Sequence, residues 1–173
     1  MEVIVLAEYL STAAPLAQLI QEFSKLPGIG PKTAQRLTYF LVKATEEQAR
    51  ALGEAILTLN GNLVFCSRCE NVTQEDPCSI CQDDGRDKAV ICVVEEPLDI
   101  LPVEHSGGYR GLYHVLHGVI SPINGIGPDD LKIRQLLPRL NGGHVNEVIL
   151  ATNPNLEGEA TAMYIQRLVS PLG

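Results

Sequence analysis

Apolar residues in the first third of the chain repeat at the spacing of an α-helix. Between residues 15 and 24 they fall at i, i+3, i+4 and i+7, namely Leu16, Leu19, Ile20 and Phe23. The stretch Leu26-Pro-Gly-Ile-Gly30 interrupts this helix, and Pro31 suits the first position of a second one. The second helix is predicted to run to about Lys43, with three residues on its buried side: Ala34, Leu37 and Leu41.

A third helix is predicted to follow. Thr45 and Gln48 have the spacing of a capping box, in which each side chain bonds the backbone N–H of the other residue. The helix is expected to end near Gly61 and to turn four residues inward: Leu52, Ala55, Ile56 and Leu59. We therefore expect residues 1–62 to form a helical N-terminal region.

The pattern changes after residue 88. Residues 89–94 are a continuous apolar run, which is typical of a buried strand in a parallel sheet. Helices are then expected near 97–104, 129–140 and 157–170, with strands near 110–116 and 147–151. This alternation predicts an α/β layer over residues 88–173.

Four cysteines punctuate the polar segment between these regions, residues 63–87. They form two C-x-x-C pairs, Cys66 with Cys69 and Cys78 with Cys81. Each pair places two sulfurs at one tight turn, and two pairs together build a closed thiolate cage for Zn²⁺. Because no ligand position is left for water, we expect a structural zinc site. A thioredoxin-type redox pair is the alternative, and the second pair argues against it. Cys92, in the apolar run, is interpreted as a core residue.

Charge is unevenly distributed along the chain. The net charge of −8 argues against a protein coated in nucleic acid. Between Phe23 and Thr45, however, there are four basic residues and no acidic one: Lys25, Lys32, Arg36 and Lys43. A local basic patch on an acidic body suits a protein that contacts phosphates in one place. A solvated helix face explains the charge alone equally well.

Residues 26–37 match the helix-hairpin-helix pattern. Gly28 and Gly30 permit a tight turn with accessible N–H groups, and the next helix start adds unpaired N–H groups and a positive dipole end. Such a site suits a backbone phosphate and reads no base edges. We therefore expect DNA binding without sequence specificity, through Lys25, Gly28, Gly30, Lys32 and Arg36. A purely structural αα-hairpin is the alternative.

The tetrapeptide Gly28-Ile-Gly-Pro31 occurs again at residues 125–128. Asp129 and Asp130 follow the second copy, where Lys32 and Thr33 follow the first. Carboxylates there would repel phosphate, so the second copy is interpreted as a plain capped helix start. A P-loop is not expected in the first copy, because Pro31 stands where that motif needs glycine.

No nucleophile–base arrangement stands out. The four histidines are expected to have structural or surface roles: His105, His114, His117 and His144. No apolar run reaches the roughly 20 residues of a membrane helix, and the acidic first residues do not suit a signal peptide. We therefore expect a cytoplasmic protein with reduced thiols and no membrane partner.

The α/β half resembles a Toprim domain. Val93-Val-Glu-Glu-Pro-Leu-Asp99 is similar to the acidic strand end of that domain, with Glu95 as its glutamate, and residues 148–159 lie where Toprim enzymes carry an Asp-x-Asp pair. Hairpin, four-cysteine site and this module follow the order of the RecR family, which the chain resembles over about residues 15–173. The resemblance implies an α/β fold with a helix-hairpin-helix region at 1–62, a four-cysteine zinc finger at 63–87 and a Toprim-like domain at 88–173.

The resemblance also implies a function. RecR proteins are non-enzymatic DNA-repair and recombination mediators that act with RecO and RecF to load RecA on single-stranded DNA. Asn153 and Asn155 replace the aspartates of Toprim enzymes, and an amide oxygen lacks the net charge that Mg²⁺ favours. Without a metal, the acidic strand end suits docking of a basic partner, associated with RecO in this family: Glu95, Asp99, Asn153, Asn155 and Glu157.

Three alternatives stay open. Glu95, Asp99, Glu157 and Glu159 could hold a weak ion, and the enzymatic alternative is a Mg²⁺-dependent Toprim nuclease or primase-like protein. The third is a protein scaffold that never touches DNA.

Self-association is a further implication of the resemblance, because RecR proteins assemble into rings. Residues 1–13 precede the usual start of the family, and the family normally continues beyond Gly173. We therefore expect dimers through the N-terminal half and poor closure of a tetrameric ring. The faces expected to meet carry Leu16, Ile20, Phe23 and Leu37.

Overall fold

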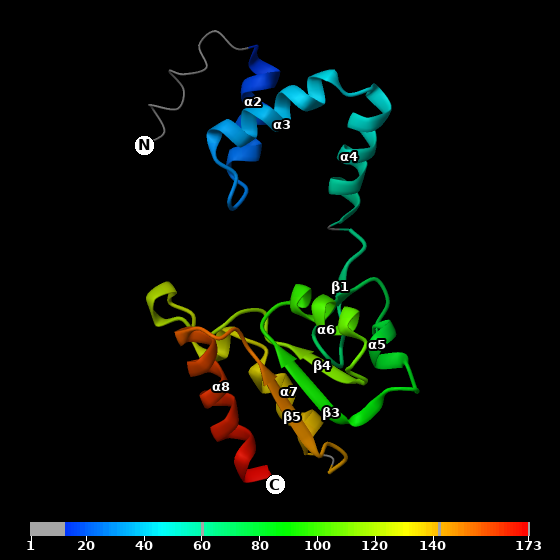
Figure 1. The fold of residues 1–173 in the computed structure, drawn as a ribbon, viewed down its shortest axis with the longest axis vertical. Coiled ribbons are helices and arrows are strands. Elements are labelled where there is room, and N and C mark those ends of the chain that lie inside the picture. The colour runs from blue at the N-terminus through cyan, green and yellow to red at the C-terminus, as the bar shows by residue number, and fades with distance from the viewer. Residues whose placement is uncertain (1–12, 60, 142, 173) are drawn as a thin grey trace. The chain divides into compact units, whose positions relative to one another are not determined.

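A computed structural model describes residues 13–59, 61–141 and 143–172 of the chain (Figure 1). The expectations for residues 1–12 lie outside the described residues. The chain divides into two compact units after Gly61. No helix in the described ranges is long and apolar enough to cross a membrane.

The first unit contains the three predicted helices: α2 (Ala14–Ser24), α3 (Pro31–Lys43) and α4 (Glu46–Leu59). Helices α2 and α3 pack against each other through buried Ile20, Ala34 and Thr38 (Figure 1). Ile20 is therefore not free for self-association as expected, because α3 covers it. The predicted capping box precedes α4: Thr45 N–H donates to Gln48 Oε1 at 3.1 Å, and Gln48 N–H donates to Thr45 Oγ1 at 3.3 Å.

The predicted burial of α3 is right for Ala34 but wrong for its other two residues, and the predicted burial of α4 is wrong. Leu37 is exposed, Leu41 is half-buried, and Thr38 takes the buried place instead. No residue of α4 is buried, and Ile56 is 59% exposed. A helical period defines which side chains share a face, but it does not supply the surface that covers them. None of the four expected inward residues of α4 is buried: Leu52, Ala55, Ile56 and Leu59.

The second unit is built on a three-stranded parallel sheet of order β4-β3-β5, which confirms the predicted α/β class. Strand β3 (Asp87–Val94) is central, with β4 (Gly111–Val115) and β5 (Glu147–Ala151) at its sides. Val93 stands opposite His114 on β4 and Leu150 on β5. The continuous apolar run of β3 follows from this central position, because its residues pack on both faces of the sheet.

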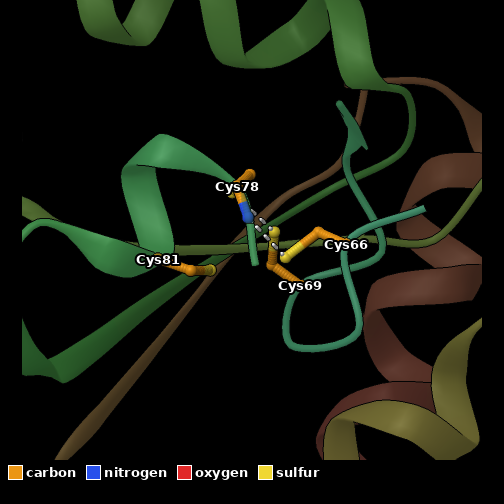
Figure 2. Close-up of side chains that lie close together, drawn as sticks. All are labelled: Cys66, Cys69, Cys78 and Cys81. Carbon is orange, nitrogen blue, oxygen red and sulfur yellow. Dashed lines mark hydrogen bonds between the residues drawn. The ribbon is translucent and has the colours of Figure 1, made fainter. Parts of the chain in front are cut away.

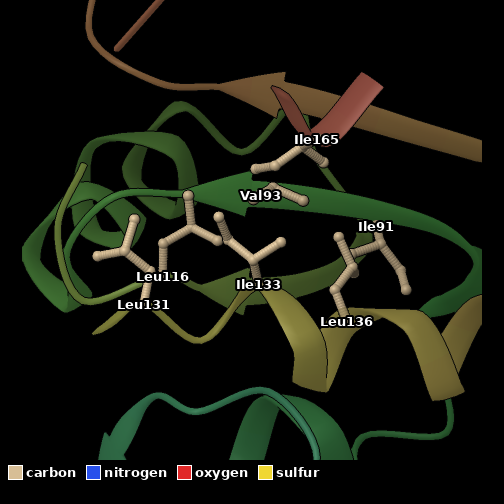
Figure 3. Close-up of a cluster of buried hydrophobic side chains, with 7 residues drawn as sticks. All are labelled: Ile91, Val93, Leu116, Leu131, Ile133, Leu136 and Ile165. Atoms are coloured by element: carbon tan, nitrogen blue, oxygen red, sulfur yellow. The ribbon is translucent and has the colours of Figure 1, made fainter. Parts of the chain in front are cut away.

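Two apolar clusters cover the two faces of the sheet. One joins β3 to α7 (Ile133–Leu140) and α8 (Leu156–Val169), and Figure 3 shows its buried members: Ile91, Val93, Leu116, Leu131, Ile133, Leu136 and Ile165. The other lies under α6 (Ile100–Ser106) and contains Cys92, Val94, Ile100, Tyr113 and Val115. Burial raises the pKa of Cys92 to about 11, as fits a core thiol.

Short elements complete the second unit. The cysteine segment holds the antiparallel pair β1 (Val64–Phe65) and β2 (Val72–Thr73), followed by α5 (Ser79–Gln82). The 3₁₀ turns are η1 (Pro97–Asp99), η2 (Pro122–Asn124), η3 (Pro128–Asp130) and η4 (Ser170–Leu172).

The second Gly-Ile-Gly-Pro copy is a capped start, as predicted, but of the 3₁₀ turn η3 and not of the α-helix expected near 129–140. Gly127 N–H donates to Asp130 Oδ2 at 2.8 Å, which closes a three-residue turn. Asp129 pairs with Arg134 at 2.7 Å, and α7 begins only at Ile133.

Candidate nucleic-acid interface and metal centre

The hairpin between α2 and α3 carries the features expected of a phosphate site. Gly28 has a φ of +78°, which favours glycine, and lets Ile29 N–H bond Leu26 O at 3.0 Å. Gly30 then caps α3 without a side-chain bond, and the first turn of α3 has no acidic residue. The backbone N–H groups of Lys32 and Thr33 therefore have no intrahelical acceptor, whereas Ala34 N–H bonds Gly30 O at 3.0 Å. Their partial positive charge suits an anion at this end of α3.

The expected DNA-binding side chains are all exposed at this hairpin. Lys32 and Arg36 stand one turn apart on α3, and no carboxylate of the described ranges forms an ion pair with either. Lys25 differs, because its Nζ lies 2.8 Å from Glu22 Oε1. Since exposed ion pairs contribute only about 0–1 kcal/mol, a phosphate can displace Glu22.

The four predicted metal-ligating cysteines converge (Figure 2). All four are buried, and their Sγ atoms lie within 4.8 Å of one another. The Cys69 and Cys78 sulfurs are 3.6 Å apart. A tetrahedral zinc site with Zn–S bonds of about 2.3 Å requires S···S distances of about 3.8 Å, so this cage fits the ion. Cys78 N–H also donates to Cys66 Sγ at 3.3 Å, a bond that joins the two cysteine pairs.

Four thiols this close cannot all ionise easily. Hydrogen bonding from Cys69 and Cys81 lowers the pKa of the Cys78 thiol, and the reciprocal bond with Cys78 raises that of Cys69. One thiolate is thus favoured at the expense of its neighbour. A divalent cation supplies the positive charge that four thiolates need, so the cluster is chemically suited to a metal.

Backbone and side-chain bonds attach the cysteine cluster to the end of β4. Val115 N–H donates to Cys69 O at 2.9 Å, and His117 Nε2 lies 2.6 Å from Glu70 O. His114 is fully buried, and its Nε2 lies 2.7 Å from Lys132 O. Desolvation lowers the pKa of His114 to about 4, so the ring is neutral. These two histidines therefore have the structural roles that the sequence predicted.

The acidic strand end contains one tightly bonded pair. Glu95 follows β3 and is 6% exposed. Its Oε1 accepts from Asn153 N–H at 2.7 Å, and its Oε2 accepts from Asn153 Nδ2 at 2.6 Å. Both carboxylate oxygens are thus satisfied by donors from one asparagine. Gly158 packs against this pair, since a Cβ there would lie 2.2 Å from Asn153 O and 2.8 Å from Glu95 Oε1.

The other residues of the acidic strand end form hydrogen bonds that stabilise nearby turns and a helix start. Asn155 caps α8, because its Oδ1 accepts from Gly158 N–H at 2.8 Å. Asp99 Oδ2 accepts from Glu96 N–H at 2.8 Å, and Glu157 accepts a hydrogen bond from Ser121 Oγ. Among the described residues, the cysteine cluster is the one group of three or more potential ligands close enough to share a metal ion.

Sequence reasoning missed a half-buried ion-pair network that begins just after the cysteine cluster. Arg86 Nη1 donates to Glu104 Oε1 and to Gly111 O, both at 3.0 Å. Tyr113 OH donates to the same Glu104 oxygen at 2.6 Å. The bond with Glu104 raises the pKa of Arg86, and the bond with Arg86 lowers that of Glu104. The sequence offered one signal for this network, because Arg86 stands directly before the apolar strand β3.

Family models match the chain in the order of these sites. The model described as RecR, helix-hairpin-helix matches residues 16–59, and the RecR four-cysteine zinc finger domain matches residues 63–83. The Toprim domain matches residues 89–173. Hairpin, cysteine cluster and α/β layer thus define a recombination protein with DNA-binding modules.

Curated relatives narrow this class. The Recombination protein RecR of Chloroflexus aggregans is 58% identical over 161 residues, covering 93% of this chain and 78% of the relative. The RecR of Herpetosiphon aurantiacus is 54% identical over 162 residues, which cover 94% of this chain and 79% of the relative. The RecR of Carboxydothermus hydrogenoformans is 56% identical over 160 residues, which cover 92% of this chain and 80% of the relative. The chain belongs to the RecR family of recombination proteins.

Proposed function

We propose that the chain is a non-enzymatic mediator of DNA recombination and repair that binds DNA through the α2–α3 hairpin. The observation that carries this proposal is the start of α3, where unpaired N–H groups lie beside exposed Lys32 and Arg36. Lys25, Gly28 and Gly30 complete the surface. Because phosphates are the same in every sequence, the binding is sequence-independent. In this proposal residues 1–62, 63–87 and 88–173 are the DNA-binding, zinc and partner-binding modules.

Two DNA duplexes of unrelated sequence test this proposal. We expect equal affinity for both, and a loss of at least about tenfold in the double variant Lys32→Gln, Arg36→Gln, since each removes a phosphate contact. The matched control is Lys88→Gln, Arg134→Gln, which removes two exposed charges that pair with Asp84 and Asp129. Equal binding by the hairpin variant and the control would contradict the assignment.

We also propose that each chain binds one Zn²⁺ through Cys66, Cys69, Cys78 and Cys81. The buried S4 donor set and the 3.6 Å sulfur separation support zinc over harder ions. Elemental analysis of the folded protein should give about one zinc per chain. Clearly less than one, in a sample without chelator, contradicts the site.

The acidic strand end is proposed as a docking face and not as a catalytic metal site. Asn153 donates two bonds to Glu95, so that a neutral amide and not a second carboxylate is the partner of this acid. The face comprises Glu95, Asp99, Asn153, Asn155 and Glu157, and by family resemblance its partner is RecO, with RecF a second partner in loading RecA.

Titration with purified RecO tests this face. Glu157→Lys should weaken the complex at least about tenfold by placing a like charge against a basic surface. Glu75→Lys, an exposed acid in the cysteine segment, should leave it unchanged. Equal effects of the two variants would show that net charge alone, and not this face, governs binding.

Self-association is proposed to use the uncovered apolar sides of α3 and α4. Phe40 is 69% exposed, Leu37 and Ile56 are also exposed, and a second copy is a suitable cover for such faces. Sedimentation of the parent should reveal an oligomer, and Phe40→Glu, Ile56→Glu should shift it to the monomer. A monomeric parent would refute this arrangement.

A further inference from the structure

One side of α3 carries a row of cations with a tyrosine among them. The row consists of Lys32, Arg36, Tyr39 and Lys43, and its spacing of four, three and four residues keeps the side chains on one side of an α-helix. All four are exposed, and Tyr39 is 52% exposed. Helix α3 contains no acidic residue, and among the described residues no carboxylate forms an ion pair with Lys43. The row is therefore positively charged along its whole length.

The row lines an open groove of about 790 Å³, which Leu37 and Phe40 also line. These two apolar residues belong to the side of α3 proposed for self-association. Successive residues of an α-helix are turned by about 100°, so a second copy can cover Phe40 and leave Tyr39 open. A second copy is a poor cover for the row itself, because in a two-fold interface like charges would meet. The row suits an anionic ligand instead.

The row is long enough for several nucleotides. Lys43 comes eleven residues after Lys32, which at a rise of about 1.5 Å per residue spans about 16 Å. Phosphates of one DNA strand are spaced by about 3.4 Å along a B-form axis, so the row reaches along up to about five nucleotides. Tyr39 lies between Arg36 and Lys43, about 4.5 Å and about 6 Å from them along the helix axis. A strand held by these two cations passes over the tyrosine ring.

We propose that the row is a site for single-stranded DNA in which Tyr39 stacks on an unpaired base. An aromatic side chain stacks on the free face of a base, whatever the base is, and in a duplex the neighbouring base pairs cover these faces. Phosphate contacts at Lys32 and Arg36 serve both forms of DNA, whereas the ring of Tyr39 serves the single strand alone. The inference rests on the proposed DNA-binding role of the hairpin and adds a strand preference to it.

Binding of the full chain to an oligothymidylate and to a duplex tests this proposal. Tyr39→Ala should weaken single-strand binding roughly tenfold, within the range for one stacked base, and leave duplex binding unchanged. Tyr39→Phe keeps the ring and should bind both forms as the parent does. The matched control is Tyr164→Ala, which removes a tyrosine that is 37% exposed on α8 and should change neither affinity. Lys43→Gln should flatten the salt slope for the single strand by about 0.7.

Fluorescence gives a second readout of stacking. The chain contains no tryptophan, so Tyr39→Trp introduces a single indole, whose emission the single strand should quench and the duplex should not. A parent that binds neither form of DNA refutes the hairpin as a DNA site. A parent that binds DNA, with Tyr39→Ala binding the single strand equally well, refutes only the stacking. Equal losses on both forms also overturn it, because they indicate a structural role. Where the Ala variant folds poorly, a Tyr39→Trp variant that binds the single strand without quenching decides against the proposal.

Discussion

Asn153 and Asn155 provide a matched pair of substitutions that separates two roles of asparagine at the acidic strand end. Asn153 uses its amide as a donor to Glu95, whereas Asn155 uses its carbonyl as an acceptor from Gly158 N–H. An aspartate can accept a hydrogen bond but, when ionised, cannot donate one. The same change, Asn to Asp, should therefore destabilise the protein at position 153 and have little effect at position 155.

Asn153→Asp should destabilise the second unit by about 2–3 kcal/mol at pH 7. It removes a charge-assisted bond worth about 1.5–3 kcal/mol and places two carboxylates together. Coulomb repulsion at about 4 Å adds up to about 4 kcal/mol at an effective dielectric constant of about 20. Asn153 is exposed, so water and side-chain rotation reduce that repulsion. We therefore expect the lower end of the combined range.

Asn155→Asp should change stability by less than about 0.5 kcal/mol, since aspartate caps a helix as well as asparagine and favours its positive end. Urea unfolding followed by circular dichroism measures both variants. Millimolar Mg²⁺ should recover part of the loss in Asn153→Asp, because a cation relieves the repulsion. Equal stability of the two variants would show that the Asn153–Glu95 contact does not hold this strand end together.

Further outcomes follow from the buried polar groups. Because the pKa of His114 is lowered to about 4, folding favours the neutral ring, and stability should fall as pH drops below about 6.5. The loss between pH 7.5 and 5.5 should be about 1.4 kcal/mol in urea unfolding and should be absent in His114→Gln. Arg86→Met should cost about 2 kcal/mol by removing the charge-assisted bonds to half-buried Glu104; a loss under about 0.5 kcal/mol contradicts this. Cys78→Ser should retain far less zinc than the parent by elemental analysis, and unchanged zinc content would contradict the four-ligand site.

The local sequence pattern was sufficient to predict the helices and strands and the metal-ligating cysteines. The predicted bounds of α3 and β5 agree with the structure, because helix caps and apolar periodicity are local properties of the chain. The four cysteines converge because short spacing within each pair restricts where their sulfurs can lie. The Toprim likeness likewise rested on residues that lie at the ends of strands.

Burial and long-range pairing were not predictable in the same way. The apolar side of α4 has the correct period, but nothing in a helical period states whether another surface covers it. The bonds of Glu95 to Asn153 and of Arg139 to His114 join residues 58 and 25 positions apart. Arg139 did offer one signal, because it lies three residues after buried Leu136 and thus near the inward side of α7.

The salt dependence of DNA binding tests the central claim most directly. Each phosphate contact adds about 0.9 to the steepness of log affinity against log salt for duplex DNA. The double variant Lys32→Gln, Arg36→Gln should therefore flatten that slope by about 2 units relative to the parent, measured with the intact assembly. Lys88→Gln, Arg134→Gln should leave the slope unchanged. An unchanged slope in the hairpin variant would contradict phosphate binding at the start of α3 and, with it, the proposed DNA-binding role of the hairpin.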